Sequence, residues 1–190
     1  MFEHIAIFFS IILSLGLVHL LGGLSLMLDA RIRNHLYWVH LLWTLNLLFL
    51  IALVWFANFA LAEANELSLA HYFVLLAYAI TIYLLCGLLF PVRGEEVVDF
   101  RKHYYANSKR FAVVGMAFVI TDACDGLIET KLLDVPLNYG QFGTLGVYFF
   151  LFLGGLFSQS HRYHACAAVV FGLGLVGFLL SLVGFPITLR

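Results

Sequence analysis

Three carboxylate side chains share one face of an otherwise apolar segment. Asp125 and Glu129 follow Asp122 by three and seven residues, which is the spacing of successive turns on one side of a helix. A carboxylate at membrane depth is costly, so it needs a partner, a proton or a water-filled cavity. At this spacing a proton or a cation can be passed from one group to the next through a single water. The pattern therefore predicts a proton or cation relay that begins near the middle of the membrane.

Two polar side chains in other apolar segments complete the candidate relay. They are Asn46 and Tyr78. A structural interpretation stays open beside the functional one, because polar side chains also hold membrane helices together. In that interpretation Asp122 makes a polar contact with Asn46 or Tyr78, while Asp125 and Glu129 meet water at the outer surface.

Two histidines in the first two apolar segments suggest a different chemistry. His19 and His40 fall at similar predicted depth, and Gly16 and Gly23 share the face of His19. A b-type haem needs two such imidazoles on different helices, and glycines leave room for a flat macrocycle. Haem b is therefore a candidate cofactor, with His19 and His40 as its ligands. The alternative is that both imidazoles form hydrogen bonds within the bundle.

The remaining histidines leave metal binding unassigned. His161 and His164 have the spacing of two ligands on one helical face, and His35 and His103 are predicted on the same side. A zinc site needs more ligands in a defined geometry, so a polar turn at the membrane surface is the preferred interpretation. A weak metal site on the opposite side would draw on His4, His71, Glu63, Glu66 and Glu129.

Composition identifies the elements that must position these residues. The chain is 63% hydrophobic and 11% charged, whereas a soluble domain is about 45–50% apolar and about 25% charged. Spanning a bilayer takes about 20 apolar residues in a helix. Six segments qualify, and they predict an all-α polytopic membrane protein with a single domain over residues 1–190. The predicted spans are 5–28, 36–62, 69–90, 111–128, 139–157 and 165–185.

Charge predicts the orientation of these spans. The first, third and fifth connections hold eight of the ten basic residues, and the opposite side holds only Lys131 and Arg190. Basic residues favour the cytoplasmic side, so both termini are expected in the periplasm of a bacterial inner membrane. The sequence shows no cleavable signal pattern, so the first span is expected to stay. A net charge of -1 argues against a nucleic-acid partner.

The connection 92–110 is expected to contain a short amphipathic helix. Val97, Phe100, Tyr104 and Phe111 repeat at helical offsets, and basic residues surround this stripe. Such helices lie in the membrane interface, with their cations near anionic headgroups. The sequence therefore predicts an interfacial helix between the third and fourth spans; a docking surface for a partner is the alternative.

Glycines predict where helices approach closely. They gather in the first, fifth and sixth spans, and Gly172 and Gly177 each belong to a pair of small residues four apart. Such pairs allow close contact between helix backbones in lipid. The first and sixth spans are therefore expected to form close-packing faces, either within the chain or in a homo-oligomer.

Two sequence stretches resemble a family. The stretch 90–107 contains a proline, an acidic stretch, Asp99 followed two residues later by Arg101, paired aromatic residues and Asn107; the other stretch is 37–43. Together they resemble a group of small, uncharacterised bacterial inner-membrane proteins, with similarity through the first four spans. The resemblance implies a six-span inner-membrane protein and no particular chemistry.

Three classes of function follow. The first is a small proton- or cation-coupled transporter or channel-like protein that uses the carboxylates of the fourth span. The second is a haem-binding electron carrier, and the third is a non-catalytic subunit or scaffold of a larger membrane complex. The sequence lacks a Walker A loop, a Gly-x-Ser-x-Gly elbow and a His-Glu-x-x-His motif, which favours a protein that is not an enzyme. Expected partners are membrane lipids, further copies of the chain or other subunits.

Overall fold

Six α-helices make up the described part of the chain in a computed structural model. The model describes residues 2–27, 36–57, 68–91, 99–132, 134 and 136–183, and it describes side chains from residue 6 to residue 181. Each helix is long and apolar enough to cross a membrane, which confirms the all-α prediction and suggests a multi-pass membrane protein. The helices are α1 (Phe2–Met27), α2 (Trp38–Ala57), α3 (Leu69–Leu89), α4 (Phe100–Leu132), α5 (Tyr139–Phe157) and α6 (His161–Val183).

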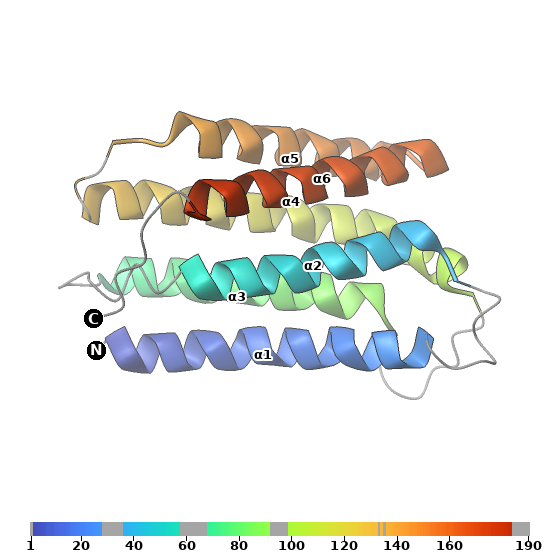
Figure 1. Cartoon of the computed structure of the whole chain (residues 1–190), viewed down its shortest axis with the longest axis horizontal. Coiled ribbons are helices and arrows are strands. Elements are labelled where there is room, and N and C mark those ends of the chain that lie inside the picture. The colour runs from blue at the N-terminus through green and yellow to red at the C-terminus, as the bar shows by residue number, and fades with distance from the viewer. Residues whose placement is uncertain are drawn as a thin grey trace.

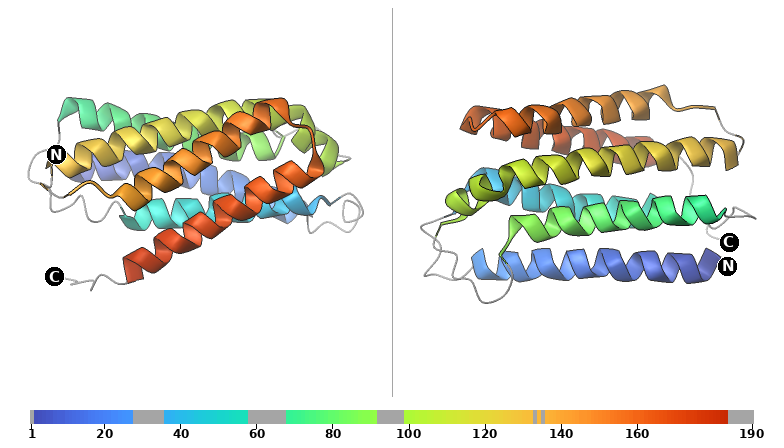
Figure 2. Two further views of the ribbon diagram at one scale, coloured as in Figure 1. Left: turned by 90° about the horizontal axis from the view of Figure 1, so that it is seen from above. Right: turned by 180° about the vertical axis from the view of Figure 1, so that it is seen from behind.

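The helices lie side by side and alternate in direction along the chain (Figure 1). From the edge inward, α1 packs on α3, α3 on α4 and α4 on α5, while α2 and α6 pack together on the other side of this row (Figure 2). Because there are six helices, α1 begins and α6 ends at the same end of the bundle.

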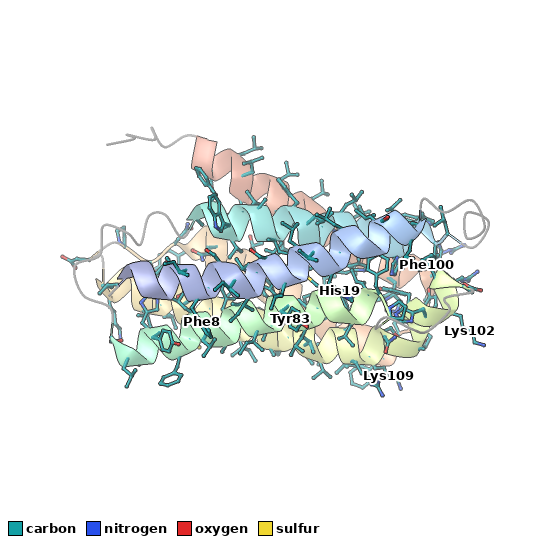
Figure 3. The ribbon with its side chains drawn as sticks, turned by 90° about the horizontal axis from the view of Figure 1, so that it is seen from below. Phe8, His19, Tyr83, Phe100, Lys102 and Lys109 are labelled. Carbon is teal, nitrogen blue, oxygen red and sulfur yellow. The ribbon has the colours of Figure 1, made fainter. Side chains whose placement is uncertain are left out.

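The two ends of the bundle carry opposite charge. The acidic end, where α3 and α5 begin and α4 ends, holds Asp122, Asp125 and Glu129 in the last third of α4. The basic end, where α2, α4 and α6 begin, holds exposed cations, and Figure 3 labels two of them, Lys102 and Lys109. The described exposed cations of the basic end are Arg101, Lys102, Lys109, Arg110 and Arg162.

Side-chain caps fix where three of the helices begin. The hydroxyl of Ser68 accepts the backbone N–H of His71 at 3.1 Å, and Asn138 accepts that of Gln141 at 3.2 Å. Asp99 accepts the N–H of Arg101 at 2.8 Å, at the start of α4. Such caps satisfy backbone donors that have no partner in the first turn.

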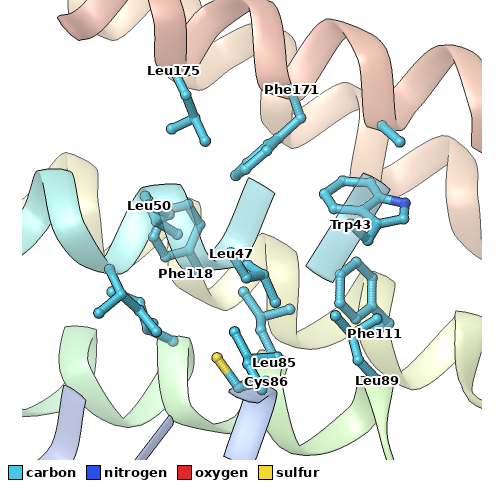
Figure 4. Packing of buried hydrophobic residues seen from close by; sticks show 14 of the residues in the cluster. Trp43, Leu47, Leu50, Leu85, Cys86, Leu89, Phe111, Phe118, Phe171 and Leu175 are labelled. Carbon is cyan, nitrogen blue, oxygen red and sulfur yellow. The ribbon is translucent and has the colours of Figure 1, made fainter. Parts of the chain in front are cut away.

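An aromatic layer fills the centre of the bundle toward the basic end (Figure 4). The indole of Trp43 on α2 lies 5.0 Å from the ring of Phe111 and 5.2 Å from that of Phe171, measured between ring centroids. Phe152 on α5 lies 5.8 Å from Trp43, and Phe118 joins the layer 6.4 Å from Phe171. These rings come from α2, α4, α5 and α6, so one apolar layer connects four helices.

The structure shows one long helix where the sequence predicts two. Residues 100–110 form the first turns of α4, which continues without a break into the predicted fourth span. A separate interfacial helix is therefore not shown, and residues 92–98 lie outside the described residues. The physical reason is that neither proline nor glycine occurs between Phe100 and Val114 to interrupt the helix.

The predicted apolar stripe is helical, but it faces the protein. Phe100, Tyr104 and Phe111 are all buried in the core, where Phe100 packs on the imidazole of His40. The expectation that this stripe lies on lipid is therefore wrong for these three residues, because the core of the bundle provides the apolar partner. Val97 lies outside the described residues.

Apart from the longer α4, the predicted span boundaries differ most from the helices at two ends. The second span was expected to reach residue 62, whereas α2 ends at Ala57 and residues 58–62 lie outside the described residues. The sixth was expected to begin at residue 165, whereas α6 begins at His161. Its first turn carries polar side chains that make contacts within the protein.

Candidate functional site

A buried hydrogen bond joins α3 to α4 at the acidic end. The Nε2 atom of His71 lies 2.8 Å from Oδ1 of Asp125. His71 has no exposed surface, and Asp125 is 8% exposed. A carboxylate oxygen can only accept here, so Nε2–H donates. Because α3 starts where α4 ends, the first turn of α3, capped by Ser68, brings His71 level with Asp125.

The sequence analysis missed this pair. It assigned His71 to a weak outer metal site and did not connect it with Asp125. The information was present, however, because His71 is three residues after the cap of the third span and Asp125 is near the end of the fourth. In antiparallel neighbours such positions share one depth. Which two of the six helices are neighbours is a tertiary property, so depth alone did not identify the pair.

Two further carboxylates extend the pair along α4. Asp122 lies about one turn inward from Asp125, and Glu129 lies about one turn toward the end of the helix. The negative charges of Asp125 and Glu129 act on Asp122, and the positive charge of a protonated His71 acts on Glu129. The three carboxylates and one imidazole therefore form one electrostatic group, as the spacing in the sequence predicts for the carboxylates.

Tyr78 lies beside this group on α3. Its ring is buried and stacks on Phe118, with centroids 5.5 Å apart, and all three carboxylates act on its hydroxyl electrostatically. One turn farther along, the hydroxyls of Thr81 and Thr121 approach to 3.5 Å between α3 and α4. Tyr78 therefore lies beside the predicted relay. The polar contact between α3 and α4 extends farther inward through Thr81 and Thr121.

Asn46 belongs to a different contact. Its amide Nδ2 donates to the carbonyl oxygen of Ala168 at 2.7 Å and so ties α2 to α6. A Cβ on Gly172 would lie 2.7 Å from Oδ1 of Asn46, so this glycine makes room for the Asn46 side chain. Gly172 therefore packs within the chain, while a Cβ on Gly177 would meet nothing within 4 Å. A homo-oligomer through Gly177 stays a prediction.

The two predicted haem ligands lie on either side of one phenylalanine. The ring of Phe90 is 6.3 Å from that of His19 and 4.8 Å from that of His40. Gly23 does make room for a flat ring, because a Cβ there would clash with the ring of Phe90. The ring that uses this room is the protein's own.

His40 also forms a hydrogen bond within the protein. Its Nε2 donates to the carbonyl oxygen of Leu89 at 2.6 Å. Among the described residues, Nδ1 of His40 and Nε2 of His19 are buried without a hydrogen-bond partner. Haem ligation through Nε2 of His40 would require the bond to Leu89 to break. Haem stays a prediction, which a visible spectrum of the purified protein would test by the presence or absence of a Soret band.

The described residues contain no group of three or more His, Cys, Asp or Glu side chains arranged to hold a metal ion. The predicted outer metal site cannot be followed further, because Glu63, Glu66 and the side chain of His4 lie outside the described part of the chain. His161 and His164, the other suggested ligand pair, each hydrogen-bond a tyrosine hydroxyl instead.

The acidic end thus presents a buried imidazole–carboxylate pair with a carboxylate on either side, and Tyr78 beside it. Such a group can take up and release protons, because imidazole is the side chain that titrates near neutral pH. Comparison with known proteins adds no family to this description: no protein-family model, curated protein or solved structure matches the chain.

Proposed function

We propose that this chain is a small membrane protein that moves protons, with the acidic end as the point where they enter. The observation that carries the proposal is the buried His71–Asp125 pair, flanked by Asp122 and Glu129 on a helix long enough to cross a membrane. Ionisable groups inside membrane helices are rare and mark ion pathways and proton relays.

The spacing suits a stepwise transfer. Successive acidic groups of α4 are three and four residues apart, which is a rise of about 5–6 Å. One water can bridge such a gap. A proton taken up at Glu129 would pass to the His71–Asp125 pair and then to Asp122. Protons are favoured over metal cations as the cargo, because a hydrogen-bonded imidazole holds a proton but repels a cation once it is charged.

Charge favours one orientation in the membrane. Five of the six described Lys and Arg side chains lie at the basic end, with Lys131 as the exception, and basic residues favour the cytoplasmic side. In a bacterial inner membrane this would put the acidic end, and both chain termini, toward the periplasm. Protons would then enter from the side that is usually more acidic.

Flux measurements on reconstituted protein test the proposal. Liposomes that contain the protein and an internal pH-sensitive dye receive an external acid step, with a potassium gradient and valinomycin to balance charge. We expect the wild-type protein to acidify the interior faster than protein-free liposomes do. Asp125→Asn and His71→Gln should each lower the rate to that of protein-free liposomes, because neither replacement exchanges a proton.

A matched control separates a specific effect from a loss of charge. Asp134 is exposed and lies at the same end of the molecule, in a left-handed backbone conformation (φ 50°) that asparagine accepts. Asp134→Asn should keep the wild-type rate. If the wild-type protein moves no more protons than empty liposomes do, the chain is not a proton carrier. Stoichiometric partners that co-purify would then favour the scaffold hypothesis.

A further inference from the structure

A second titratable network lies at the basic end, far from the carboxylates. Tyr37, just before α2, is its centre. The Tyr37 hydroxyl lies 3.0 Å from the hydroxyl of Tyr105 on α4 and 2.8 Å from Nδ1 of His161 on α6. Tyr37 itself is buried, whereas Tyr105 and His161 are partly exposed. The Tyr105–Tyr37–His161 chain therefore connects three helices and has both of its ends near the surface.

A second chain begins at the neighbouring residue. The Tyr104 hydroxyl lies 3.0 Å from Nδ1 of His164, and Nε2 of His164 lies 2.9 Å from the carbonyl oxygen of Ser158. A carbonyl can only accept, so Nε2 carries a hydrogen. When His164 is neutral, Nδ1 must then accept the hydrogen of Tyr104. Both Tyr104 and His164 are buried.

The surroundings keep the Tyr37 hydroxyl protonated. The Arg101 guanidinium of α4 lies 5.8 Å from the centre of the Tyr37 ring. Burial raises the pKa of Tyr37 above its ordinary value, and the hydrogen bond with Tyr105 raises it further. The Tyr37 hydroxyl therefore serves as a neutral carrier between Tyr105 and His161.

Side chains of the neighbouring helices also contact the imidazoles of His161 and His164. The indole of Trp38 on α2 meets His161 edge-on, with centroids 5.7 Å apart. His164 contacts the ring of Tyr105 from α4 and that of Tyr163 from its own helix, and the charge of a protonated His161 acts on it. The only formal charge among these neighbours in the described part of the chain is that of Arg101.

A small cavity continues inward from this network. It has a volume of about 20 Å³, which is enough for one water. Its polar lining comes from Tyr104, Ser108 and His164, and its far wall includes Trp43 and Phe152 of the aromatic layer. The cavity is lined by the Tyr104–His164 contact and by the aromatic layer, and most of its lining is apolar.

We propose that the Tyr–His network is a second proton-exchange site, which serves the aqueous phase at the basic end. This inference rests on the proposed proton-carrying function and gives its path an exchange site at each end. The aromatic layer of Trp43, Phe111, Phe152 and Phe171 separates the two sites in the described conformation.

The exchange step balances in protons and charge. A hydronium ion gives one proton to the oxygen of Tyr104, while the hydroxyl hydrogen of Tyr104 moves to Nδ1 of His164. The products are water, a neutral tyrosine and an imidazolium, whose Nε2–H still donates to Ser158. In the same way, a proton on His161 reverses the direction of donation along Tyr37 and Tyr105. One passage of a proton thus reverses the donation along the chain, and the hydroxyls must rotate back before the next proton can follow.

His164→Gln is the decisive variant. Glutamine keeps an acceptor for Tyr104 and a donor for Ser158 but does not exchange protons. We expect it to lower pH-driven flux in liposomes to the rate of protein-free liposomes. The matched control is His103→Gln, at another histidine of the basic end, which should keep the wild-type rate. His161→Gln serves as a second variant if His164→Gln does not fold.

A measurement that does not depend on transport distinguishes the two proposals. In nanodiscs, nitrogen NMR of labelled histidine should show that the His164 ring gains a proton as the pH is lowered, and that Tyr104→Phe shifts this titration. If the wild-type protein transports and His164→Gln transports equally well, the second site is wrong while the proposed function stands. If the wild-type protein does not transport, the proposed function is wrong, and a His164 ring that keeps one protonation state throughout overturns the exchange site as well.

Discussion

Several polar side chains inside this bundle contact a group on another helix. Asn46 donates to Ala168 across the α2–α6 contact, Tyr148 donates from α5 to the Phe171 carbonyl at 2.8 Å, and His71 meets Asp125. In an apolar solvent a polar group without a partner is costly. These residues therefore fix the pairing of helices as well as any chemistry.

Replacing one member of the His71–Asp125 pair should cost more folding stability than replacing both members. His71→Ala leaves Asp125 buried without its partner, and such a loss destabilises by about 3–5 kcal/mol. His71→Leu combined with Asp125→Leu should cost much less, because no buried charge remains. Unfolding of the purified protein in mild detergent measures both. If the double variant loses as much stability as His71→Ala does, or more, then the cost of burying Asp125 does not depend on His71.

Two adjacent glycines of α1 give a matched test of packing. A Cβ on Gly23 would clash with the Phe90 ring, whereas one on Gly22 would meet nothing within 4 Å. Phe90 is held by Phe100 and His40, so it cannot move freely.

Gly23→Ala should therefore destabilise by about 1–3 kcal/mol, while Gly22→Ala should be neutral or slightly stabilising because alanine favours helix. Thermal unfolding compares them. Phe90→Leu in the Gly23→Ala background should recover part of the loss, since the smaller side chain relieves the contact. Equal stability of the two alanine variants would contradict this packing.

At the scale of the element, the outward face of α4 changes from basic to apolar along its length. Lys102 and Lys109 are exposed on this face, and Val113, Ile120 and Leu127 continue it at 53%, 52% and 46% exposure. Lys109 and Lys131 bound the apolar stretch, and their separation corresponds to a rise of about 33 Å. The hydrocarbon core of a bilayer is roughly 30 Å thick. The first turns of α4 would then lie in the headgroup layer.

Cysteine labelling tests this placement of α4. In a background without the three native cysteines, Lys109→Cys and Lys131→Cys should react with a water-soluble maleimide in liposomes, whereas Ile120→Cys should not, because lipid surrounds it. A membrane-impermeant reagent should reach the first two from opposite sides. Rapid labelling of Ile120→Cys would mean that this face of α4 is in water.

For the whole molecule, the even number of helices determines where the chain begins and ends. The start of α1 and the end of α6 lie at the acidic end (Figure 1), and the described Lys and Arg side chains other than Lys131 lie at the other. If all six helices cross the membrane, the two termini share one side, and the positive-inside rule assigns that side to the periplasm.

Reporter fusions measure this orientation. Alkaline phosphatase fused after residue 190 should be active in bacteria, whereas green fluorescent protein at the same position should stay dark, because each reporter matures on a different side of the membrane. Fusions in the connection after α1 should give the reverse pattern. If the C-terminal green fluorescent protein fusion is fluorescent, the orientation is opposite to the one proposed, and so is the direction of proton entry.

The candidate site shows what the sequence predicted and what it missed. The offsets of Asp122, Asp125 and Glu129 were enough to group them, because residues one turn apart on a helix must be near each other. Tyr78 was expected near them and lies there. Asn46 was expected in the same relay but contacts α6, and His71 was not expected as the partner of Asp125. Those outcomes depend on contacts between helices, which the spacing of residues along one helix does not reveal.

The sequence by itself determined that the chain folds into six apolar helices, because hydrophobic length and backbone hydrogen bonding in an apolar solvent leave few alternatives. It also determined the charge of each end and the carboxylate face of α4. Only the tertiary structure decided that His71 reaches Asp125, that Phe90 lies between His19 and His40, and that Tyr37 connects α4 with α6. The physical reason is that these contacts depend on which helices are neighbours and how each is rotated, and the side chains of all six helices determine both together.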